Sequence, residues 1–552
     1  MEKAVSVYSK KDISDYIRDA KENGICEHGF ARLAADLTIL ISNGRLENSR
    51  SDAEEMMTLC CEQLPAVPPV FRGNWVGNDF AVKELVFALL EAERSGAFKK
   101  ELTEMWRNGL ARLVPERSYN SIPDTPHTRV ANWSAYGAAS EQLRAYAGLA
   151  DEKDFIELEI GSQIRHFDKN GMYRDPGEPM LYDIVTRLQL IIALEYGYSG
   201  KYRAELERLL SLSREMTLKM QSVSGEIPFG GRSAQFLYNE AAFASLCEAE
   251  AVRCKREGKL VLAGQFRNAA RLAAESVESW LSVPRIRHIK NRMSKKSKFG
   301  CEGYGYFNKY MVTLASMIYP AYLLADETIP LRACPAVKGG FCAETGADFH
   351  KLFINGGGYF LQLELSADPC YDASGLGRIH KKGVPSPLML SVPFAKRPHY
   401  NIGKQNPSFL SIAPIYVSGN KMLSGASPDT RYSVCRTDGS TAFLTCDIKG
   451  CPSLLWWDIS ASRNGVGLRL SGEGTVGFTV PVFMSDGYEN TEVSCDGHSL
   501  TVTYRGAKAV YTSNGTFTAP SGEWRNRNGA YAACTVTAEG ELTLDITAKA
   551  AK

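Results

Sequence analysis

Glu240 is an acidic residue on the apolar stripe of an expected helix. Phe236 precedes it by four residues, and Phe243 and Cys247 follow it by three and seven, so all four share one helical face. A carboxylate in such surroundings is costly unless it is paired or hydrogen-bonded, and burial raises its pKa. A carboxyl group that keeps its proton near neutral pH can protonate a leaving group. Glu240 is therefore a candidate general acid.

Polar residues directly before this acid extend the candidate site. Gly230-Gly231 permits a tight turn into the helix, and Arg232, Gln235 and Asn239 then follow, the last two being four residues apart. A polar cluster beside an apolar stripe, after a glycine turn, predicts a lined pocket in which these three side chains bind substrate. The alternative is that they are structural polar residues.

Two more expected helix starts carry candidate residues. Asp183 and Arg187 are four residues apart, so they can form a structural ion pair, or Asp183 can stay ionised as a catalytic base or nucleophile. Tyr182 precedes them as a candidate substrate ligand. Asn132-Trp133 places an amide beside an aromatic ring, a combination that holds sugars, although an Asn N-cap followed by a core Trp explains the same pattern.

The segment EGYGYFNK at 302–309 offers further reactive groups. Glu302 can replace either carboxylate of a two-acid mechanism, and Tyr304 and Tyr306 can contact a sugar or remove a proton. A basic run, PRIRHIKNRMSKKSKF at 284–299, precedes this segment. We expect this run to be a solvated loop, with guidance of an anionic substrate as its alternative role.

The second half of the chain contains one unusual expected loop, 371–383. It links two strand-like runs and places Arg378, His380 and Lys381 among glycines. If this loop reaches the mouth of the helical half, Arg378 and His380 are candidates to bind a carboxylate, a task for which a planar guanidinium is well suited. The alternative is a solvated hairpin.

Hydrophobic periodicity divides the chain into two parts. Up to about residue 325 apolar residues recur at three- and four-residue steps, and the motifs near 132, 182 and 236 are about 50 residues apart, the length of a helical hairpin. Beyond about residue 345 apolar and polar residues alternate, with Asp-Gly and Asn-Gly turns between the runs. The expected helices cover 81–95, 133–150, 184–198, 236–253, 266–281 and 306–325, and the expected strands include 359–367, 408–419, 442–450, 498–519 and 541–550.

These periods predict an N-terminal (α/α) toroid followed by an antiparallel β-sandwich. We expect the toroid to be the catalytic domain over residues 1–328, a linker to cover 329–345, and the sandwich to cover 346–552.

Composition narrows the choice of partners. The 552 residues carry a net charge of +2, which gives no reason to expect binding to nucleic acid or to a membrane. There is no metal-ligand spacing, Walker motif or nucleophile elbow, so we expect neither a metal nor another cofactor. The 14 cysteines lack C-x-x-C pairs and no secretory signal is evident, which favours a cytoplasmic protein with reduced thiols; a secreted form with a trimmed signal is the alternative.

Three strings carry a family resemblance: GGRSAQFLYNEA, EGYGYFNKYM and YDASGLGRIHKKGVPSPLMLSVP. They are similar to glycoside hydrolase family 154, and the order of helices and strands resembles the heparinase II/III-like lyases. The resemblance covers roughly residues 70 to 480. It implies a β-glucuronidase that removes terminal glucuronic acid from glycans, built as a toroid plus a sandwich, and it implies no catalytic residues.

Hydrolysis by two carboxylates is the favoured function, with Glu240 as the acid and Asp183 as the base or nucleophile. The expected partner is a uronate-containing oligosaccharide or glycoconjugate, and homo-oligomerisation stays open. The runner-up is a polysaccharide lyase, in which a Tyr or His removes the proton at C5 while an amide or guanidinium neutralises the carboxylate. The residues available for that role are Tyr304, Tyr306, His380, Asn132 and Arg232. A third interpretation is a sugar-binding protein without catalysis.

Overall fold

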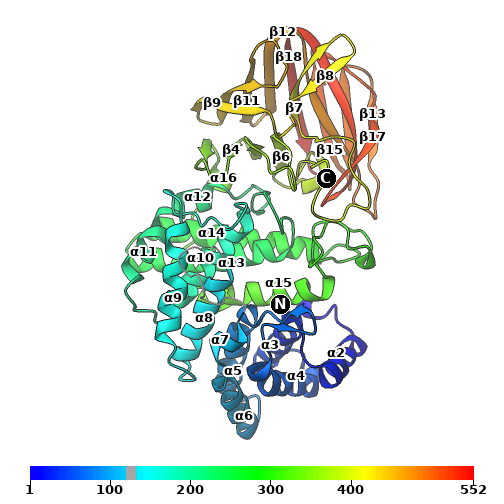
Figure 1. Ribbon diagram of the computed structural model, residues 1–552. Helices are drawn as coiled ribbons and strands as arrows, with labels where there is room; N and C mark the ends of the chain where they lie inside the picture. Colours follow the sequence, from blue (N-terminus) through cyan, green and yellow to red (C-terminus); the bar gives the residue numbers. More distant parts are fainter. Residues whose placement is uncertain (120–131, 552) are drawn as a thin grey trace.

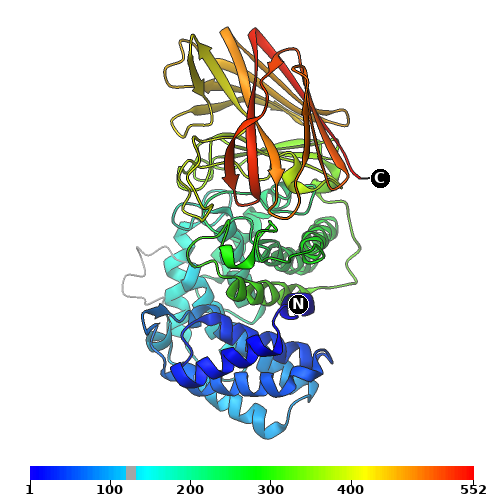
Figure 2. The same cartoon turned by 90° about the vertical axis from the view of Figure 1, so that its right-hand side faces the viewer.

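The computed structural model describes residues 1–119 and 132–551. Helices make up the first part of the chain and antiparallel strands the second (Figure 1). Seen from the side, in Figure 2, the helices of the first hundred residues lie furthest from the sheets. The later helices therefore separate the N-terminal region from the β part.

Among the described residues, six helices form a closed inner ring. Each of them contacts the next in chain order, and the last one packs back against the first. This closure makes the helical part a toroid rather than an open solenoid. The inner helices are α3 (His28–Ser42), α5 (Val82–Ser95), α8 (Asn132–Tyr146), α10 (Met180–Glu195), α13 (Tyr238–Arg256) and α15 (Phe307–Leu324).

An outer layer of helices packs against this ring. Its members are α1 (Glu2–Val5), α4 (Arg50–Gln63), α6 (Lys100–Ala111), α9 (Lys153–Gln163), α11 (Arg203–Leu212) and α14 (Leu260–Leu281). The remaining α-helices are α2 (Lys10–Asn23), α7 (Pro115–Ser118), α12 (Arg214–Lys219) and α16 (Pro335–Lys338). Short 3-10 turns are η1 (Glu47–Ser49), η2 (Leu64–Ala66), η3 (Asn78–Phe80), η4 (Ile164–His166), η5 (Lys295–Ser297) and η6 (Ser386–Leu388).

The inner helices are apolar around most of their circumference, because they have neighbours on nearly every side. Every residue of α3 from His28 to Ile41 is buried, and α10 is buried almost throughout. A helix that is hydrophobic all round belongs in an interior. Local signals fix the ends of other helices: Ser9 and Asp12 form a capping box that starts α2, and Gly96 adopts the left-handed conformation that ends α5.

The strands of the second part form two antiparallel sheets. The smaller sheet has the order β3-β4-β5-β6, and the path of the larger one is β13-β14-β15-β18-β12-β11-β10-β9. The smaller sheet consists of β3 (Phe341–Glu344), β4 (Lys351–Gly356), β5 (Tyr359–Glu364) and β6 (Gly375–Lys381). The larger contains β7 (Ala413–Ser418), β8 (Lys421–Ser424), β9 (Arg431–Asp438), β10 (Thr441–Asp447), β11 (Leu455–Ser462), β12 (Gly465–Ser485), β13 (Glu492–Cys495), β14 (Ser499–Tyr504), β15 (Ala507–Ser513), β16 (Thr516–Phe517), β17 (Ser521–Asn526) and β18 (Gly529–Lys549). A two-stranded hairpin, β1 (Val70–Phe71) with β2 (Asn74–Trp75), lies within the helical part.

The smaller sheet is the layer that joins the sandwich to the toroid. Leu352 and Ile354 of β4 share one apolar core with the larger sheet, whereas Phe353 and Phe360 belong to the core of the helical part. Alternate side chains of a strand point to opposite faces. Both faces of this sheet are therefore buried, one against the second sheet and one against the helices.

The fold class predicted from periodicity is confirmed: an (α/α) toroid precedes an antiparallel β-sandwich. The expected linker, 329–345, contains α16 and β3. We retain the division at 328 and 346 as a proposal. The prediction of a loop at 371–383 is wrong, because most of this segment forms the buried strand β6. A run with buried residues on both faces shows no alternation and can be mistaken for a loop.

All fourteen cysteines are free thiols. Within the described ranges no helix is long and apolar enough to cross a membrane. The same ranges hold no group of three His, Cys, Asp or Glu side chains that could bind a metal ion.

Candidate functional site

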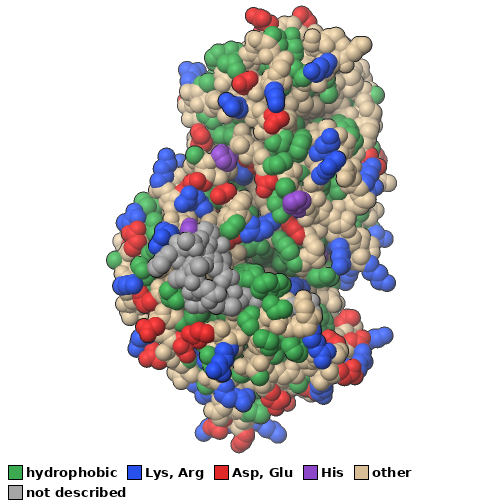
Figure 3. Space-filling model, viewed as in Figure 1, with side chains coloured by type: hydrophobic (Ala, Val, Ile, Leu, Met, Phe, Trp, Pro, Cys, Tyr) green, Lys and Arg blue, Asp and Glu red, His purple; other side chains and the backbone are tan. Residues whose placement is uncertain are grey.

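A cavity of about 520 Å³, here called the inner cavity, lies at one end of the helical ring. On the face drawn in Figure 3 the surface is hollowed near the middle of the molecule, at the level of the helices. The cavity walls come from the first turns of the inner helices and from the connections that precede them. The lining residues are His28, Arg32, Trp75, Gly77, Phe80, Asn132, Trp133, Tyr136, Asp175, Pro176, Tyr182, Val185, Arg232, Tyr238, Tyr304, Lys309, Tyr310 and Thr313.

This location gathers positive groups around the inner cavity, and Asp175 and Glu84 offset part of their charge. The N-terminal end of each helix carries about half a positive charge, and the N-terminal ends of the inner helices face this one space. Helices α5, α10, α13 and α15 have no side-chain cap to occupy their first N–H groups. Arg32, Arg232 and Lys309 add full charges to the same wall. The cavity therefore favours an anionic ligand.

Asp175 is a buried carboxylate on this wall. Its Oδ1 accepts hydrogen bonds from the backbone N–H of Asn132 (3.0 Å) and from Asn132 Nδ2 (3.2 Å), and its Oδ2 pairs with Arg232. Burial raises the pKa of Asp175 above its ordinary value, and the Arg232 charge and the Asn132 hydrogen bonds oppose that rise. Arg232 also lies over the Tyr182 ring, 4.4 Å from its centroid. A carboxyl with a raised pKa in a cavity is a candidate proton donor.

Three hydroxyl groups form a row beside this pair. Ser233 Oγ lies 3.1 Å from the Tyr182 hydroxyl and 2.8 Å from the Tyr304 hydroxyl. Burial raises the pKa of both tyrosines, so both are protonated at neutral pH. Ser233 adopts a left-handed backbone conformation with φ of 60°, which is strained for a non-glycine residue. Such strain persists only where surrounding contacts fix it.

Glu302 provides that fixation. Its Oε1 accepts a hydrogen bond from the backbone N–H of Ser233 at 2.6 Å, and both of its oxygens pair with Arg527, at 2.6 and 3.1 Å. Asn239 donates to the Ser233 carbonyl at 3.1 Å from the other side. Glu302 therefore positions the hydroxyl row and does not itself line the inner cavity, which corrects the expectation that it could serve as one of the two catalytic carboxylates.

His28 opens α3 at the wall of the inner cavity. Its side chain is 8% exposed, its Nδ1 has no hydrogen-bond partner among the described residues, and its ring meets the Phe80 ring edge-on at 5.4 Å. Burial first, and then the charges of Arg32 and Lys309, lower its pKa. The imidazole is therefore neutral at pH 7 and can accept a proton.

Aromatic rings also line the inner cavity. Trp133 lies 5.4 Å from Trp75 and 5.8 Å from Phe80 between ring centroids, and Phe80 meets Tyr136 edge-on at 4.9 Å. Indole rings present flat apolar faces on which the C–H faces of a sugar can stack.

A second, wider cavity of about 910 Å³ adjoins the inner one and is called the outer cavity. The two cavities share Trp75, Tyr304 and Lys309 as wall residues. Tyr306 and Glu27 line the outer cavity. Glu27 caps α3 by accepting a hydrogen bond from Gly29 N–H at 3.0 Å, and its Oε2 lies 3.7 Å from Lys309 Nζ.

The inner cavity brings together part of the set expected from sequence. Its members from that set are Asn132, Trp133, Tyr182, Arg232 and Tyr304. Gln235 lies outside, where its Oε1 accepts a hydrogen bond from Asn528 at 3.1 Å. Gln235 and Asn239 therefore shape the turn before α13 and do not contact this cavity.

Asp183 and Arg187 are not part of the cavity wall, which corrects their expected catalytic and ligand roles. They form a buried bidentate ion pair, at 2.8 and 2.6 Å. Asp183 also accepts from Tyr173 N–H at 2.7 Å, and Arg187 donates to Ser213 and Thr217. These hydrogen bonds occupy both carboxylate oxygens of Asp183 and the guanidinium group of Arg187. The two residues therefore form the structural ion pair that was the alternative to a catalytic role.

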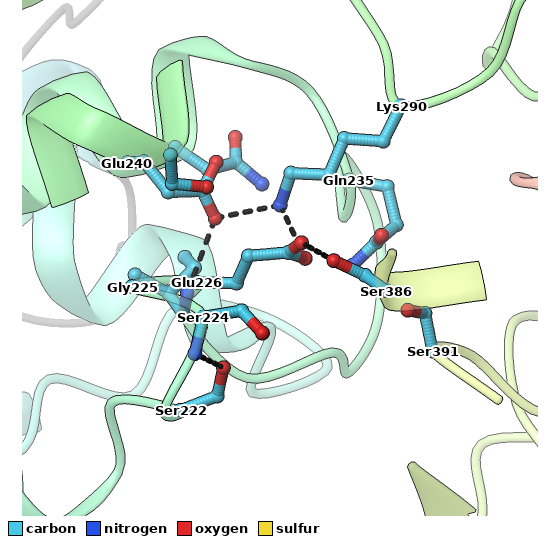
Figure 4. Close-up of polar contacts among 12 residues, drawn as sticks. Ser222, Ser224, Gly225, Glu226, Gln235, Glu240, Lys290, Ser386 and Ser391 are labelled. Carbon is cyan, nitrogen blue, oxygen red and sulfur yellow. Dashed lines mark hydrogen bonds and ion pairs between the residues drawn. The ribbon is translucent and has the colours of Figure 1, made fainter. Parts of the chain in front are cut away.

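Glu240 is also removed from both cavities, and this corrects its expected role as the general acid. Its Oε1 accepts a hydrogen bond from Lys290 Nζ at 2.7 Å and another from Ile227 N–H at 3.1 Å. The same ammonium group reaches Glu226 Oε2 at 2.9 Å (Figure 4). Burial raises the pKa of Glu240, but this residue lines neither the inner nor the outer cavity. Glu240 is therefore a buried structural acid that pairs with Lys290.

Arg378 and His380 of β6 do not reach the inner cavity either. Arg378 donates to the Ile227 carbonyl at 2.6 Å and to the Ser391 carbonyl at 3.0 Å. His380 lies 2.9 Å from Ser222 Oγ and 2.7 Å from Ser391 Oγ. Burial lowers the pKa of His380 to about 3. These contacts join the sandwich to the toroid and correct the expectation that both residues bind a carboxylate.

The basic run 284–299 is divided between two environments. Arg287, Lys290 and Arg292 are buried, and Arg292 pairs with Asp486 of the sandwich, so this part is not the solvated loop expected. The lysines from 295 to 298 are exposed beside the outer cavity. The first half of this run therefore joins the helical part to the sandwich.

Sequence reasoning missed Asp175, His28, Arg32 and Ser233. A usable signal existed, because the N-terminal ends of inner helices converge in a toroid, and every polar residue near a helix start or in the connection before it is then a candidate. Lys309, in the first turn of α15, lies in the segment 302–309 that the sequence had singled out.

No protein-family model matches the chain, and no curated protein matches it. Several solved structures are similar. They include the chondroitin AC lyase of Streptomyces coelicolor A3 (12% identity, 98% of this chain and 80% of that chain covered, TM-score 0.44). They also include a family 105 glycoside hydrolase of C. acetobutylicum ATCC 824 (11%, 56% and 98%, 0.34) and a GH127 β-L-arabinofuranosidase of Geobacillus stearothermophilus T6 (10%, 97% and 93%, 0.36). Similarities this low assign neither a reaction nor residue roles to this chain.

Proposed function

We propose that the inner cavity binds a uronate sugar of a glycan or glycoconjugate and that the protein cleaves the bond to this sugar. One observation carries the proposal: Arg32, Arg232 and Lys309 share a single cavity with the N-terminal ends of the inner helices and with Trp133. The guanidinium and ammonium groups and the helix N-terminal ends suit a carboxylate, and the indole face suits a pyranose ring. The resemblance to glycoside hydrolase family 154 points to terminal glucuronic acid as the substrate group.

Hydrolysis is the reaction we propose. Asp175 donates its proton to the glycosidic oxygen while the bond from that oxygen to the anomeric carbon breaks, and water attacks the anomeric carbon. His28, on the wall of the inner cavity, accepts the proton of that water. Arg232 holds Asp175 and turns its remaining N–H groups to the uronate carboxylate.

β-Elimination is the second candidate, favoured by the hydroxyl row of Tyr182, Ser233 and Tyr304 and by neutral His28. In this reaction His28 removes the proton at C5, the bond from C4 to the leaving oxygen breaks, and Tyr304 protonates that oxygen. A double bond between C4 and C5 remains in the sugar. Asn132 would neutralise the carboxylate together with a guanidinium group.

Product mass from an oligosaccharide that carries glucuronic acid at its non-reducing end and a second, O4-substituted glucuronic acid inside the chain tests the proposal. Hydrolysis adds one water to the two products together, whereas elimination adds none and leaves an unsaturated product that absorbs in the ultraviolet. The matched control substrate carries a glucose cap, and the matched variant is Arg232→Gln. Cleavage of the glucose-capped control at the same rate, or full activity of Arg232→Gln, would contradict uronate recognition by this cavity.

A further inference from the structure

The outer cavity has the features of a second sugar-binding subsite. Three of its aromatic side chains are unusually exposed: Trp75 is 58%, Tyr306 48% and Tyr304 38% exposed. Large aromatic rings in water are unfavourable unless they meet a partner, and a group of them at one cavity marks a binding surface. Because Trp75 and Tyr304 also line the inner cavity, a ligand that leaves the inner cavity passes directly over these rings.

The outer cavity also has an excess of positive charge. Lys295, Lys296 and Lys298 line it, and none of them forms an ion pair within the described ranges. Lys298 lies over the Tyr306 ring at 4.0 Å from its centroid, and Lys295 lies over the Phe307 ring at 4.3 Å. The lysines are thus gathered beside the aromatic rings and are not spread over a solvated face.

The two acids of the outer cavity, Asp12 and Glu27, offset only part of this charge, and only Asp12 interacts with one of the three lysines, Lys295. Asp12 accepts hydrogen bonds from the backbone N–H of Ser9 at 2.8 Å and from Ser9 Oγ at 2.7 Å, which uses it as a helix cap. Glu27 caps α3 and lies beside Lys309. The three lysines are left with positive charge that a negative ligand group can compensate.

We propose that the outer cavity binds the sugar on the leaving side of the cleaved bond and selects one that carries an anionic group, either a sulfate ester or a second carboxylate. This proposal rests on the proposed function of the inner cavity and adds its substrate class. The glycan then lies with its terminal uronate at Arg232, its next ring over Trp75 and Tyr306, and the anionic group at Lys296 and Lys298. Charge-assisted hydrogen bonds from ammonium groups give the preference.

The test uses three disaccharides with terminal glucuronic acid, whose second sugar is neutral, O-sulfated or a uronic acid. We expect KM to be about fivefold to tenfold lower for at least one anionic disaccharide than for the neutral one, a range set by two partly exposed charge pairs. Lys296→Ala/Lys298→Ala should remove this difference and leave KM for the neutral disaccharide unchanged. The matched control is Lys421→Ala/Lys508→Ala, which removes two exposed lysines of the sandwich.

The outcomes separate this proposal from the proposed function. If wild-type protein cleaves the neutral disaccharide but neither anionic group lowers KM, the subsite proposal is wrong and the proposed function stands. If no disaccharide is cleaved, the proposed function is wrong, and calorimetric titration of the same three sugars decides the subsite independently of turnover. Equal Kd values for all three sugars would then overturn it, whereas tighter binding of an anionic sugar that weakens in 1 M salt would support it.

Discussion

Lys290→Met should lower the free energy of unfolding more than any surface lysine substitution. The Lys290 ammonium lies 2.7 Å from Glu240 and 2.9 Å from Glu226, and all three side chains are at most 1% exposed. Removing one partner of a buried ion pair costs about 3–5 kcal/mol. Because one cation serves two carboxylates, we expect the upper part of that range at pH 7.5, about 4–5 kcal/mol. Arg378 stays nearby but bonds to neither carboxylate.

The loss in Lys290→Met should depend on pH. In the wild type, burial raises the pKa of Glu226, but nearby positive charges, above all that of Lys290, outweigh burial and lower this pKa to about 2. That depressed pKa contributes stability above the unfolded value of about 4.3 and loses it as the pH falls toward 2. Without Lys290 both carboxyls have raised pKa values in the folded state. The variant should therefore be least impaired near pH 5, where protons neutralise them, and most impaired above pH 7.

Urea titration followed by circular dichroism at pH 5 and pH 7.5 measures both effects. Lys296→Met is the control, since Lys296 is exposed and should cost less than about 0.5 kcal/mol. Glu240→Gln/Lys290→Met should recover part of the loss, because it buries one uncompensated carboxylate instead of two. A loss below about 1 kcal/mol, or an equal loss at both pH values, would refute the reasoning.

Three further predictions concern the cavity. With Asp175 as proton donor, kcat should fall as the pH rises through its raised pKa, and Asn132→Ala, which removes a hydrogen bond that lowers that pKa, should move this limb of the pH–rate profile to higher pH. Tyr304→Phe should lower kcat by less than about tenfold in a hydrolase but by about 100-fold or more in a lyase, measured on an oligosaccharide with both a terminal and an internal O4-linked glucuronic acid. Arg527→Met should cost about 3 kcal/mol in the urea titration, because Glu302 is left buried without its cation. A pH–rate profile that does not move in Asn132→Ala would contradict Asp175 as the proton donor. A Tyr304→Phe effect that does not match the reaction shown by product mass would contradict the role given to Tyr304. A loss of stability below about 1 kcal/mol in Arg527→Met would contradict the argument from the buried ion pair.

The sequence predicted the elements well because periodicity is a local property. Segments expected at 81–95 and 306–325 became α5 and α15 with ends within one residue of those bounds. The Asp438-Gly439 and Asp496-Gly497 pairs form hairpin turns between β9 and β10 and between β13 and β14, as turn chemistry predicts. Helix starts also located Asn132, Trp133 and Tyr182 at the cavity.

The roles of the acids were not predictable, because their partners are distant in the chain. Lys290 is 50 residues from Glu240, and Arg527 is 225 residues from Glu302. An acid on an apolar stripe has the same local pattern whether it donates protons to substrate or binds a buried cation. Only the tertiary structure separates these cases, and it makes Asp175, in a connection before α10, the carboxylate of the inner cavity.

The closure of the ring has a consequence for biosynthesis. Arg32 of α3 donates a hydrogen bond to Thr313 of α15 at 2.7 Å, across 281 residues of chain. A ribosome must therefore release α15 before α3 can bury its last apolar side, although α3 is among the first helices made. During that interval the nascent chain exposes a helix that is mostly apolar and is buried on nearly every side in the folded protein, which is the kind of segment that chaperones bind. The cavity itself first exists when the two ends of the ring meet.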